Sequence, residues 1–138
     1  MTHLDTSFLV DLLREQQRHA PGPATDWLEA HADEPLGLSV FVACELEAGA
    51  ARTAHPQRER QRVRELLETT TVVYPDDRYA AMYGDLLARM QLRGRSIGAM
   101  DLLIATTAGV ESVPLLTGNT RHFEHVPDLR LLSYKTRT

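Results

Sequence analysis

Residues 1–13 read MTHLDTSFLVDLL, and their pattern sets the expectation for the rest of the fold. The first four residues lead directly into Asp5, which we interpret as the end of a brief strand. Apolar residues then recur with helical spacing, at Phe8, Leu9, Leu12 and Leu13. We therefore expect a helix to follow at once and to run to about Gln16, before the break that the Pro-Gly-Pro sequence at 21–23 predicts.

The rest of the chain repeats this alternation of strands and helices. Apolar, β-branched and aromatic runs predict further strands at 36–39, 69–74, 113–117 and 129–132. Helical spacing, with Ser39 and Asp76 as caps and Gly109 as a stop, predicts helices at about 27–34, 40–51, 56–68, 78–92 and 99–108, and a turn at 118–123. The alternation indicates an α/β fold, a sandwich around a mostly parallel central sheet, in one domain at 1–138. Ligands of such sheets bind beyond the carboxyl ends of the strands, where Asp5 and residues 117–119 fall.

The composition favours a globular protein of the cytoplasm. Hydrophobic residues make up 43% of the chain and charged residues 25%. No apolar run approaches the roughly 18 residues that span a bilayer, and the N-terminus carries no export signal, so we expect no membrane contact. The single cysteine, Cys44, cannot form an internal disulfide, and we expect it to be a small buried residue rather than a nucleophile.

The net charge of −4 is unusual for a nucleic-acid-binding protein, but the arginines are clustered. They form two groups, one at Arg52, Arg58, Arg60, Arg62 and Arg64 and the other at Arg89, Arg93 and Arg95. These groups could contact RNA, or they could be solvated helix faces with Glu59, Glu65 and Glu68 as partners. A nuclease that holds metal ions with carboxylates can be acidic overall, so the net charge leaves both interpretations open.

Three carboxylates occupy positions where solvated surface charges are not expected. Asp5 closes the first strand, whereas Glu45 and Asp101 have apolar or small neighbours three and four residues away on their helices. No lysine or arginine stands at those positions to neutralise them. Because buried carboxylates are costly unless paired, protonated or metal-bound, the pattern favours a cation. Oxygen ligands without a cysteine or histidine motif indicate Mg²⁺ or Mn²⁺ rather than zinc.

Each acid also has a purely structural interpretation. Asp5 could cap the helix that follows it, and Asp101 could interact with the dipole of its own helix, in whose first turn it lies. Glu47 has neighbours as small as those of Glu45, so spacing does not choose between these two glutamates. Asp85 faces alanine and methionine in the long helix, and we expect it to be a boundary residue.

Four further segments fall in a characteristic order. They are LDTS at 4–7, SVFVACELEAG at 39–49, GRSIGAMDLLIA at 94–105, and LLTGNTRHF at 115–123 followed by VPDL at 126–129. In this order they resemble the four motifs of PIN domains, and in particular the VapC toxins of bacterial toxin–antitoxin pairs. The third and fourth segments are the most specific, and the four together span nearly the whole chain. The resemblance implies a PIN-like three-layer α/β/α sandwich and a metal-dependent endoribonuclease.

The resemblance also implies roles for individual residues, and it selects Glu45 over Glu47. It implies a catalytic set of three metal-binding acids and a fourth residue, at Asp5, Glu45, Asp101 and Asn119. The fourth position often holds aspartate in the family, and an asparagine there brings no charge. Supporting hydroxyls that hold the carboxylates are implied at Thr6, Ser7 and Thr117. RNA contacts are conceivable at Arg121 and His122, although turn and packing roles fit these two residues equally well.

The resemblance implies Mg²⁺ as the cofactor, with Mn²⁺ able to substitute, and a structured RNA such as tRNA or ribosomal RNA as the substrate. Attack by metal-activated water would leave a 5′-phosphate and a 3′-hydroxyl. The resemblance further implies a homodimer and a cognate VapB-like antitoxin whose C-terminal segment lies across the active site. Operator DNA would then be bound only through the antitoxin.

Other protein classes fit the sequence less well. A response-regulator receiver needs an acidic pair after its first strand and a lysine near its last, yet Thr6 follows Asp5 and Lys135 is the only lysine. Phosphatases with an aspartate nucleophile need a second aspartate where Ser7 stands. Two alternatives stay open. One is a PIN-fold module that only binds RNA or protein, which the three retained acids argue against and Asn119 leaves open. The other is an RNA-processing nuclease without an antitoxin.

Overall fold

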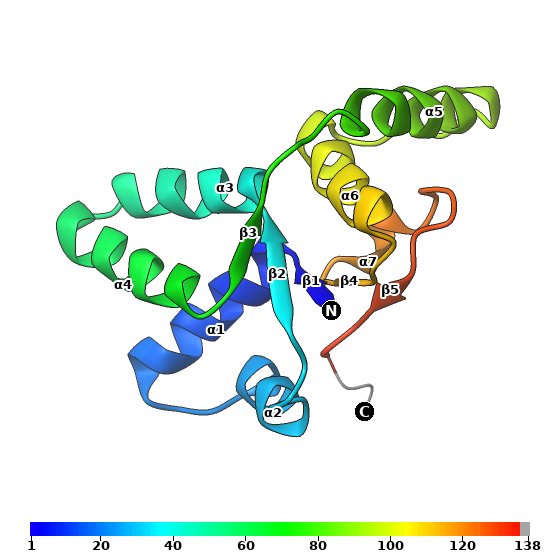
Figure 1. Cartoon of the computed structure of the whole chain (residues 1–138). Helices are drawn as coiled ribbons and strands as arrows, with labels where there is room; N and C mark the ends of the chain where they lie inside the picture. Colours follow the sequence, from blue (N-terminus) through cyan, green and yellow to red (C-terminus); the bar gives the residue numbers. More distant parts are fainter. Residues whose placement is uncertain (136–138) are drawn as a thin grey trace.

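An all-parallel sheet of five strands forms the centre of the computed structural model, which describes residues 1–135 (Figure 1). The strands are β1 Thr2–Leu4, β2 Leu36–Ser39, β3 Thr71–Val73, β4 Leu115–Leu116 and β5 Leu131–Leu132. They lie in the order β3-β2-β1-β4-β5, and every neighbouring pair is parallel. The prediction of a mostly parallel sheet is therefore confirmed.

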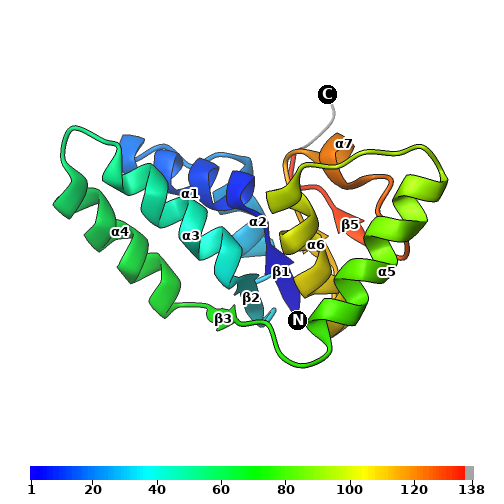
Figure 2. The ribbon, with the colours of Figure 1, turned by 90° about the horizontal axis from the view of Figure 1, so that it is seen from above.

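Helices cover both faces of this sheet. They are α1 Thr6–Arg18, α2 Pro23–Ala30, α3 Val40–Ala51, α4 Pro56–Glu68, α5 Tyr79–Leu92, α6 Ala99–Glu111 and the short α7 Thr120–Phe123. Viewed from above, α1, α3 and α4 lie on one side of the strands and α5 and α6 on the other (Figure 2). The predicted three-layer α/β/α sandwich is thus confirmed. No helix in the described part of the chain has the length and apolar character that crossing a bilayer requires.

Strand β1 lies in the centre of the sheet, and all three of its residues are buried. Helix α1 then turns its apolar stripe, Phe8, Leu9 and Leu12, into the core beneath the sheet. The chain runs from β1 outward to β3 and then crosses back to β4 on the other side of β1. This reversal between β1 and β4 is the topological switch point, where parallel sheets leave an open crevice at their carboxyl ends.

Several expectations about local structure were wrong. Helix α6 continues through Gly109 to Glu111, because Ser112 supplies the left-handed residue (φ 55°) that ends it. Part of the predicted turn at 118–123 is helix α7. Asp76 does not occupy the cap position of α5, because the helix begins at Tyr79 and Arg78 is its cap residue. The Asp76 carboxylate instead accepts a hydrogen bond from the Arg78 backbone N–H. Cys44 is exposed rather than buried.

Helix α2 begins four residues earlier than its apolar pattern predicts. Pro23 occupies its first turn, and its N-terminus is covered by Glu15 from α1, which is only 4% exposed. The Glu15 carboxylate accepts the backbone N–H groups of Gly22 (2.8 Å), Ala24 (3.1 Å) and Thr25 (2.9 Å). A carboxylate at this position satisfies the free N–H groups and the positive end of the helix dipole.

Candidate active site

The predicted acids line one cleft at the carboxyl ends of β1 and β4, with a volume of about 440 Å³. We call it the acidic cleft. Of the residues singled out in the sequence, it is lined by Asp5, Thr6, Ser7, Glu45, Asp101, Asn119 and His122. These residues come from the starts of α1, α6 and α7, the middle of α3 and the β4–α7 connection. The fold thus brings together residues more than one hundred positions apart.

Asp5 is held by a network of hydroxyl groups. It is 4% exposed, and its Oδ2 accepts hydrogen bonds from Ser7 Oγ (2.9 Å) and Thr117 Oγ1 (2.7 Å). These hydroxyls in turn accept backbone N–H groups from Gly118 and Asn119, each at 2.9 Å. The Asp5 side chain makes no capping bond to α1, so the structural interpretation of this residue as a helix cap does not hold. The network fixes one carboxylate oxygen and leaves Oδ1 without a hydrogen bond from residues 1–135.

Glu45 and Glu47 are separated by the structure, although their sequence surroundings are alike. Glu45 lines the acidic cleft, and its Oε1 accepts a hydrogen bond from Thr6 Oγ1 at 2.5 Å. Glu47 lies on another face of α3, with its Oε2 3.9 Å from Arg60 Nε of α4. Only Glu45 therefore stands with the other acids.

Asp101 completes the group of three acids, from the first turn of α6. Burial raises the pKa of its carboxyl above the ordinary value, and the nearby charges of Asp5 and Glu45 raise it further. His122 opposes this shift, since its Nδ1 lies 3.4 Å from Asp101 Oδ2. The three acids thus repel one another in the protein alone.

The donor set of the cleft suits a hard divalent cation. Carboxylate oxygens, one amide and hydroxyl groups line the cleft, beside the imidazole of His122 and the cationic groups of Arg14 and Lys135, with no thiol. Within residues 1–135, however, no three His, Cys, Asp or Glu side chains converge tightly enough to form a preformed metal-binding group. A cation bound there would offset the repulsion from Asp5 and Glu45, which adds to the effect of burial in raising the pKa of Asp101.

Sequence reasoning missed four residues that also line the acidic cleft: Val10, Asp11, Arg14 and Lys135. The spacing of Ser7, Asp11 and Arg14 is helical, so the polar face of α1 was a usable signal for Asp11 and Arg14 but not for the apolar Val10. Nothing local marks Lys135, because the last described segment reaches the cleft only through the tertiary fold. Arg121, in contrast, is exposed and does not line the cleft.

The arginines of α4 do not share one role. Arg62 donates to the Leu13 carbonyl of α1 at 2.7 Å and pairs with Glu59 at 3.1 Å, so it joins two helices. Arg58, Arg60 and Arg64 are exposed. In the second group, Arg93 and Arg95 line a separate shallow pocket beside α7.

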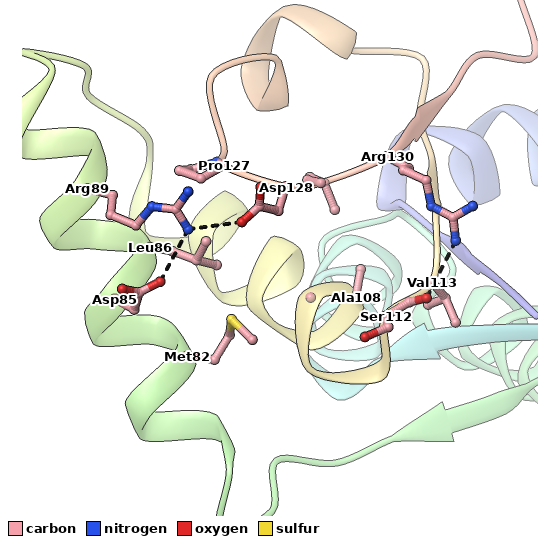
Figure 3. A pocket seen from close by; sticks show the side chains of 12 residues that line it. Met82, Asp85, Leu86, Arg89, Ala108, Ser112, Val113, Pro127, Asp128 and Arg130 are labelled. Carbon is pink, nitrogen blue, oxygen red and sulfur yellow. Dashed lines mark hydrogen bonds and ion pairs between the residues drawn. The ribbon is translucent and has the colours of Figure 1, made fainter.

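A further cavity of about 350 Å³ lies between α5, α6 and residues 127–130 (Figure 3). Arg89 spans its rim, with its Nη1 3.4 Å from Asp85 and 3.0 Å from Asp128. None of the predicted site residues lines it. Asp85 is 58% exposed and paired with Arg89, so it is a surface residue rather than the boundary residue expected from the sequence.

The sequence is similar to known proteins over most of its length. A sequence model of the PIN domain family matches residues 3–129. Ribonuclease VapC2 of Haemophilus influenzae is 31% identical over 127 residues, 92% of either chain. Ribonuclease VapC10 of Mycobacterium tuberculosis is 38% identical over 108 residues, 78% of this chain and 77% of the relative.

Solved structures share the fold. VapBC2 from Rickettsia felis, bound to a DNA fragment from their promoter, matches with a TM-score of 0.86 and 25% identity, over 97% of this chain and 98% of the other. DNA-bound VapBC from Salmonella typhimurium matches with a TM-score of 0.87 and 23% identity over the same shares, which bears on the fold alone. The chain therefore belongs to the PIN-domain family, in the group that includes the VapC ribonucleases.

Proposed function

We propose that the protein is the toxin of a VapBC-type toxin–antitoxin pair and a divalent-metal-dependent endoribonuclease. One observation carries the proposal: Asp5, Glu45 and Asp101, from three separate elements, line a single cleft at the switch point of the sheet. The names of the relatives support ribonuclease activity. Structured RNA, such as tRNA or ribosomal RNA, is the substrate class that we propose.

The three acids would hold the cation, with Mg²⁺ the first choice and Mn²⁺ a substitute. When bound, the cation supplies positive charge and Lewis acidity toward water and the phosphodiester. The hydroxyls of Ser7 and Thr117 hold Asp5, and Thr6 holds Glu45, so the acids need little reorganisation of their own hydrogen bonds. Asn119 lines the same cleft and offers an uncharged oxygen.

The proposed reaction is hydrolysis of a phosphodiester. Water adds its oxygen to phosphorus, the bond from phosphorus to the 3′ oxygen breaks, and a proton passes to that leaving oxygen. The products are a 5′-phosphate and a 3′-hydroxyl, and the 2′-hydroxyl takes no part as a nucleophile.

We further propose a homodimer and an antitoxin partner whose C-terminal segment reaches the cleft. One solved relative is VapBC2 from Rickettsia felis bound to a DNA fragment from their promoter. A groove of about 350 Å³ between α1, α3 and α4 shares Val10, Arg14 and Glu45 with the acidic cleft. A segment seated in this groove would extend directly to the acids, and operator DNA would be bound through the antitoxin.

The test is cleavage of purified total RNA with Mg²⁺, with Mn²⁺ and with EDTA, by the parent protein and by Asp5→Ala and Asp101→Asn. Discrete fragments with 5′-phosphate ends, dependent on metal and on both acids, are expected. If the Asp101→Asn protein cleaves at the parent rate, the carboxylate mechanism is wrong. If the folded, antitoxin-free parent cleaves nothing with either metal, the module that only binds RNA or protein becomes the better assignment.

A further inference from the structure

Two cationic side chains line the acidic cleft together with the acids: Arg14 from α1 and Lys135 from the segment after β5. Both are exposed. Within residues 1–135, neither has a nitrogen within 4.0 Å of a carboxylate oxygen, although the cleft contains four acids. Their charges are therefore available to an anion that enters the cleft.

The position of Lys135 is set by the residue before it. Tyr134 is 5% exposed, and its ring packs edge-on against Phe8 with centroids 4.9 Å apart. Its hydroxyl donates to Asp11 Oδ2 at 2.5 Å, with the Ser7 carbonyl oxygen at 3.2 Å. Tyr134 thus anchors the segment to the buried and cleft-facing sides of α1, and Lys135 follows directly at the rim of the cleft.

Gly118 allows this segment to lie close to the end of β4. A Cβ atom at position 118 would stand 2.9 Å from Lys135 Cε and 3.2 Å from its Nζ. The ammonium group therefore lies against the backbone that leads from Thr117, which holds Asp5, to Asn119. Lys135 belongs to the same group of side chains as the acids, although it is 130 residues from Asp5.

We propose that Arg14 and Lys135 bind phosphates of the RNA strand on either side of the phosphodiester that is cleaved. The inference rests on the proposed function. An RNA strand must enter a cleft lined by four carboxylates that oppose it, and these two cations, unpaired within residues 1–135, supply the attraction. Guanidinium and ammonium groups both bind phosphate, the first in a bidentate manner and the second as a compact charge.

The first test measures binding of a fluorescent single-stranded RNA by anisotropy in EDTA, where cleavage is not expected, over a series of salt concentrations. Arg14→Gln and Lys135→Gln should each weaken binding and should each reduce the magnitude of the slope of log K against log salt by about 0.7. Arg18→Gln, which removes an exposed arginine at the far end of the same helix, outside the acidic cleft, is the matched control for Arg14. Slopes equal to that of the parent, or no RNA binding by the parent, would overturn the inference.

The second test uses the chemistry of the only lysine. Lys135 and the N-terminal amine are the amines of the chain, and the N-terminal amine lies beside Glu34, 3.4 Å away, at the other end of β1. RNA should slow acetylation of Lys135 by acetic anhydride several-fold and leave acetylation of the N-terminus unchanged, as measured by mass spectrometry. Equal protection of both amines or of neither, or protection by an antitoxin peptide but not by RNA, would contradict an RNA contact.

These outcomes are separable from failure of the proposed function. If the parent cleaves RNA with metal while Arg14→Gln and Lys135→Gln match it in affinity and salt slope, only the inference fails. If the parent binds RNA through these cations but never cleaves it, the nuclease proposal fails and the contact stands.

Discussion

Asp101 is the acid whose ionisation the folded protein opposes most clearly. Burial, Asp5 and Glu45 raise its pKa, and His122 only partly offsets this. Because the folded state holds this proton more tightly than the unfolded chain, the ionised carboxylate weakens the fold at neutral pH. We therefore expect Asp101→Asn to abolish cleavage and yet to have, in EDTA at pH 7, a Tm at or above that of the parent.

The control for this prediction is Glu29→Gln, which removes an exposed acid of α2 and should change neither the Tm nor cleavage. The Tm difference between Asp101→Asn and the parent should shrink as the pH falls below 3.8, the ordinary pKa of the carboxyl, because the parent residue then becomes protonated in the unfolded state as well. A lower Tm for Asp101→Asn at pH 7 would show that the acids of the cleft are not in repulsion.

His3 is a second residue with a pH-dependent effect, this time on stability alone. It is 1% exposed in β1, and its Nε2 has no hydrogen-bond partner among residues 1–135. Burial, and then the charge of the N-terminal amine, lower its pKa to about 4. The folded state therefore binds this proton less readily than the unfolded state, and stability present above pH 6.5 is lost toward pH 4, by up to about 1.4 kcal/mol per unit.

Urea unfolding between pH 7 and pH 4 would measure this loss. His3→Leu should flatten the pH dependence of the unfolding free energy over that range, whatever its effect on stability at pH 7. His55→Gln removes an exposed histidine and should leave the slope as in the parent. An unchanged slope in His3→Leu would mean that His3 is protonated with equal ease in both states.

At the scale of elements, the start of α2 depends on a side chain of another helix. The Glu15 carboxylate accepts three backbone N–H groups and the Thr25 hydroxyl. Burial tends to raise its pKa, but the hydrogen bonds from Thr25, Ala24 and Gly22 lower it on balance. We expect Glu15→Ala to cost about 2–3 kcal/mol of unfolding free energy at pH 7, because it leaves several N–H groups without an acceptor.

This cost should fall as the pH falls below 4.5, because a carboxylate whose pKa is lowered in the folded state stabilises the fold only when ionised. Glu29→Ala, in the exposed part of α2 itself, is the comparison variant and should cost much less. A loss at pH 7 no larger than that of Glu29→Ala would show that α2 does not need the carboxylate.

Local pattern was enough to predict the elements but not every boundary. Short apolar, β-branched and aromatic runs placed the strands, because the strands of a parallel sheet covered on both faces have nearly continuous apolar sequences. The stop expected at Gly109 failed because a glycine in a helix that packs against its neighbours costs only about 1 kcal/mol, and α6 packs against α5. The early start of α2 could not be predicted, since Glu15 acts across eight residues and through a turn.

The candidate site divides in the same way. Glu45 and Asp101 could be predicted because a carboxylate among apolar neighbours on a helix is unusual, and those neighbours are only three or four residues away in the sequence. Lys135 carries no such mark, because an exposed lysine near the end of a chain is ordinary in sequence and acquires a role only beside Gly118. Glu45 could be separated from Glu47 only by family resemblance or by the position of α4.

At the scale of the whole molecule, the sheet order explains why the two ends of the chain share one site. With β1 in the centre and β4 and β5 on one side of it, the segment after β5 returns across the start of α1. Tyr134 closes this arrangement through its contact with Phe8 and its hydrogen bond to Asp11. The cleft is therefore complete only when the last segment is docked.

Substitution of Tyr134 tests this dependence. Tyr134→Phe keeps the ring against Phe8 but removes the hydroxyl from Asp11, and we expect a loss of about 1 kcal/mol in urea unfolding. Tyr134→Ala removes the packing as well and should cost roughly 3–5 kcal/mol. Tyr74→Ala, at a position that is 67% exposed, should cost far less. If Tyr134→Ala is as stable as Tyr74→Ala, the last segment is not a structural part of the cleft.

RNA binding gives a second measurement of the same dependence. Because Lys135 is positioned through Tyr134, Tyr134→Phe should also weaken RNA binding, while Tyr74→Ala should not.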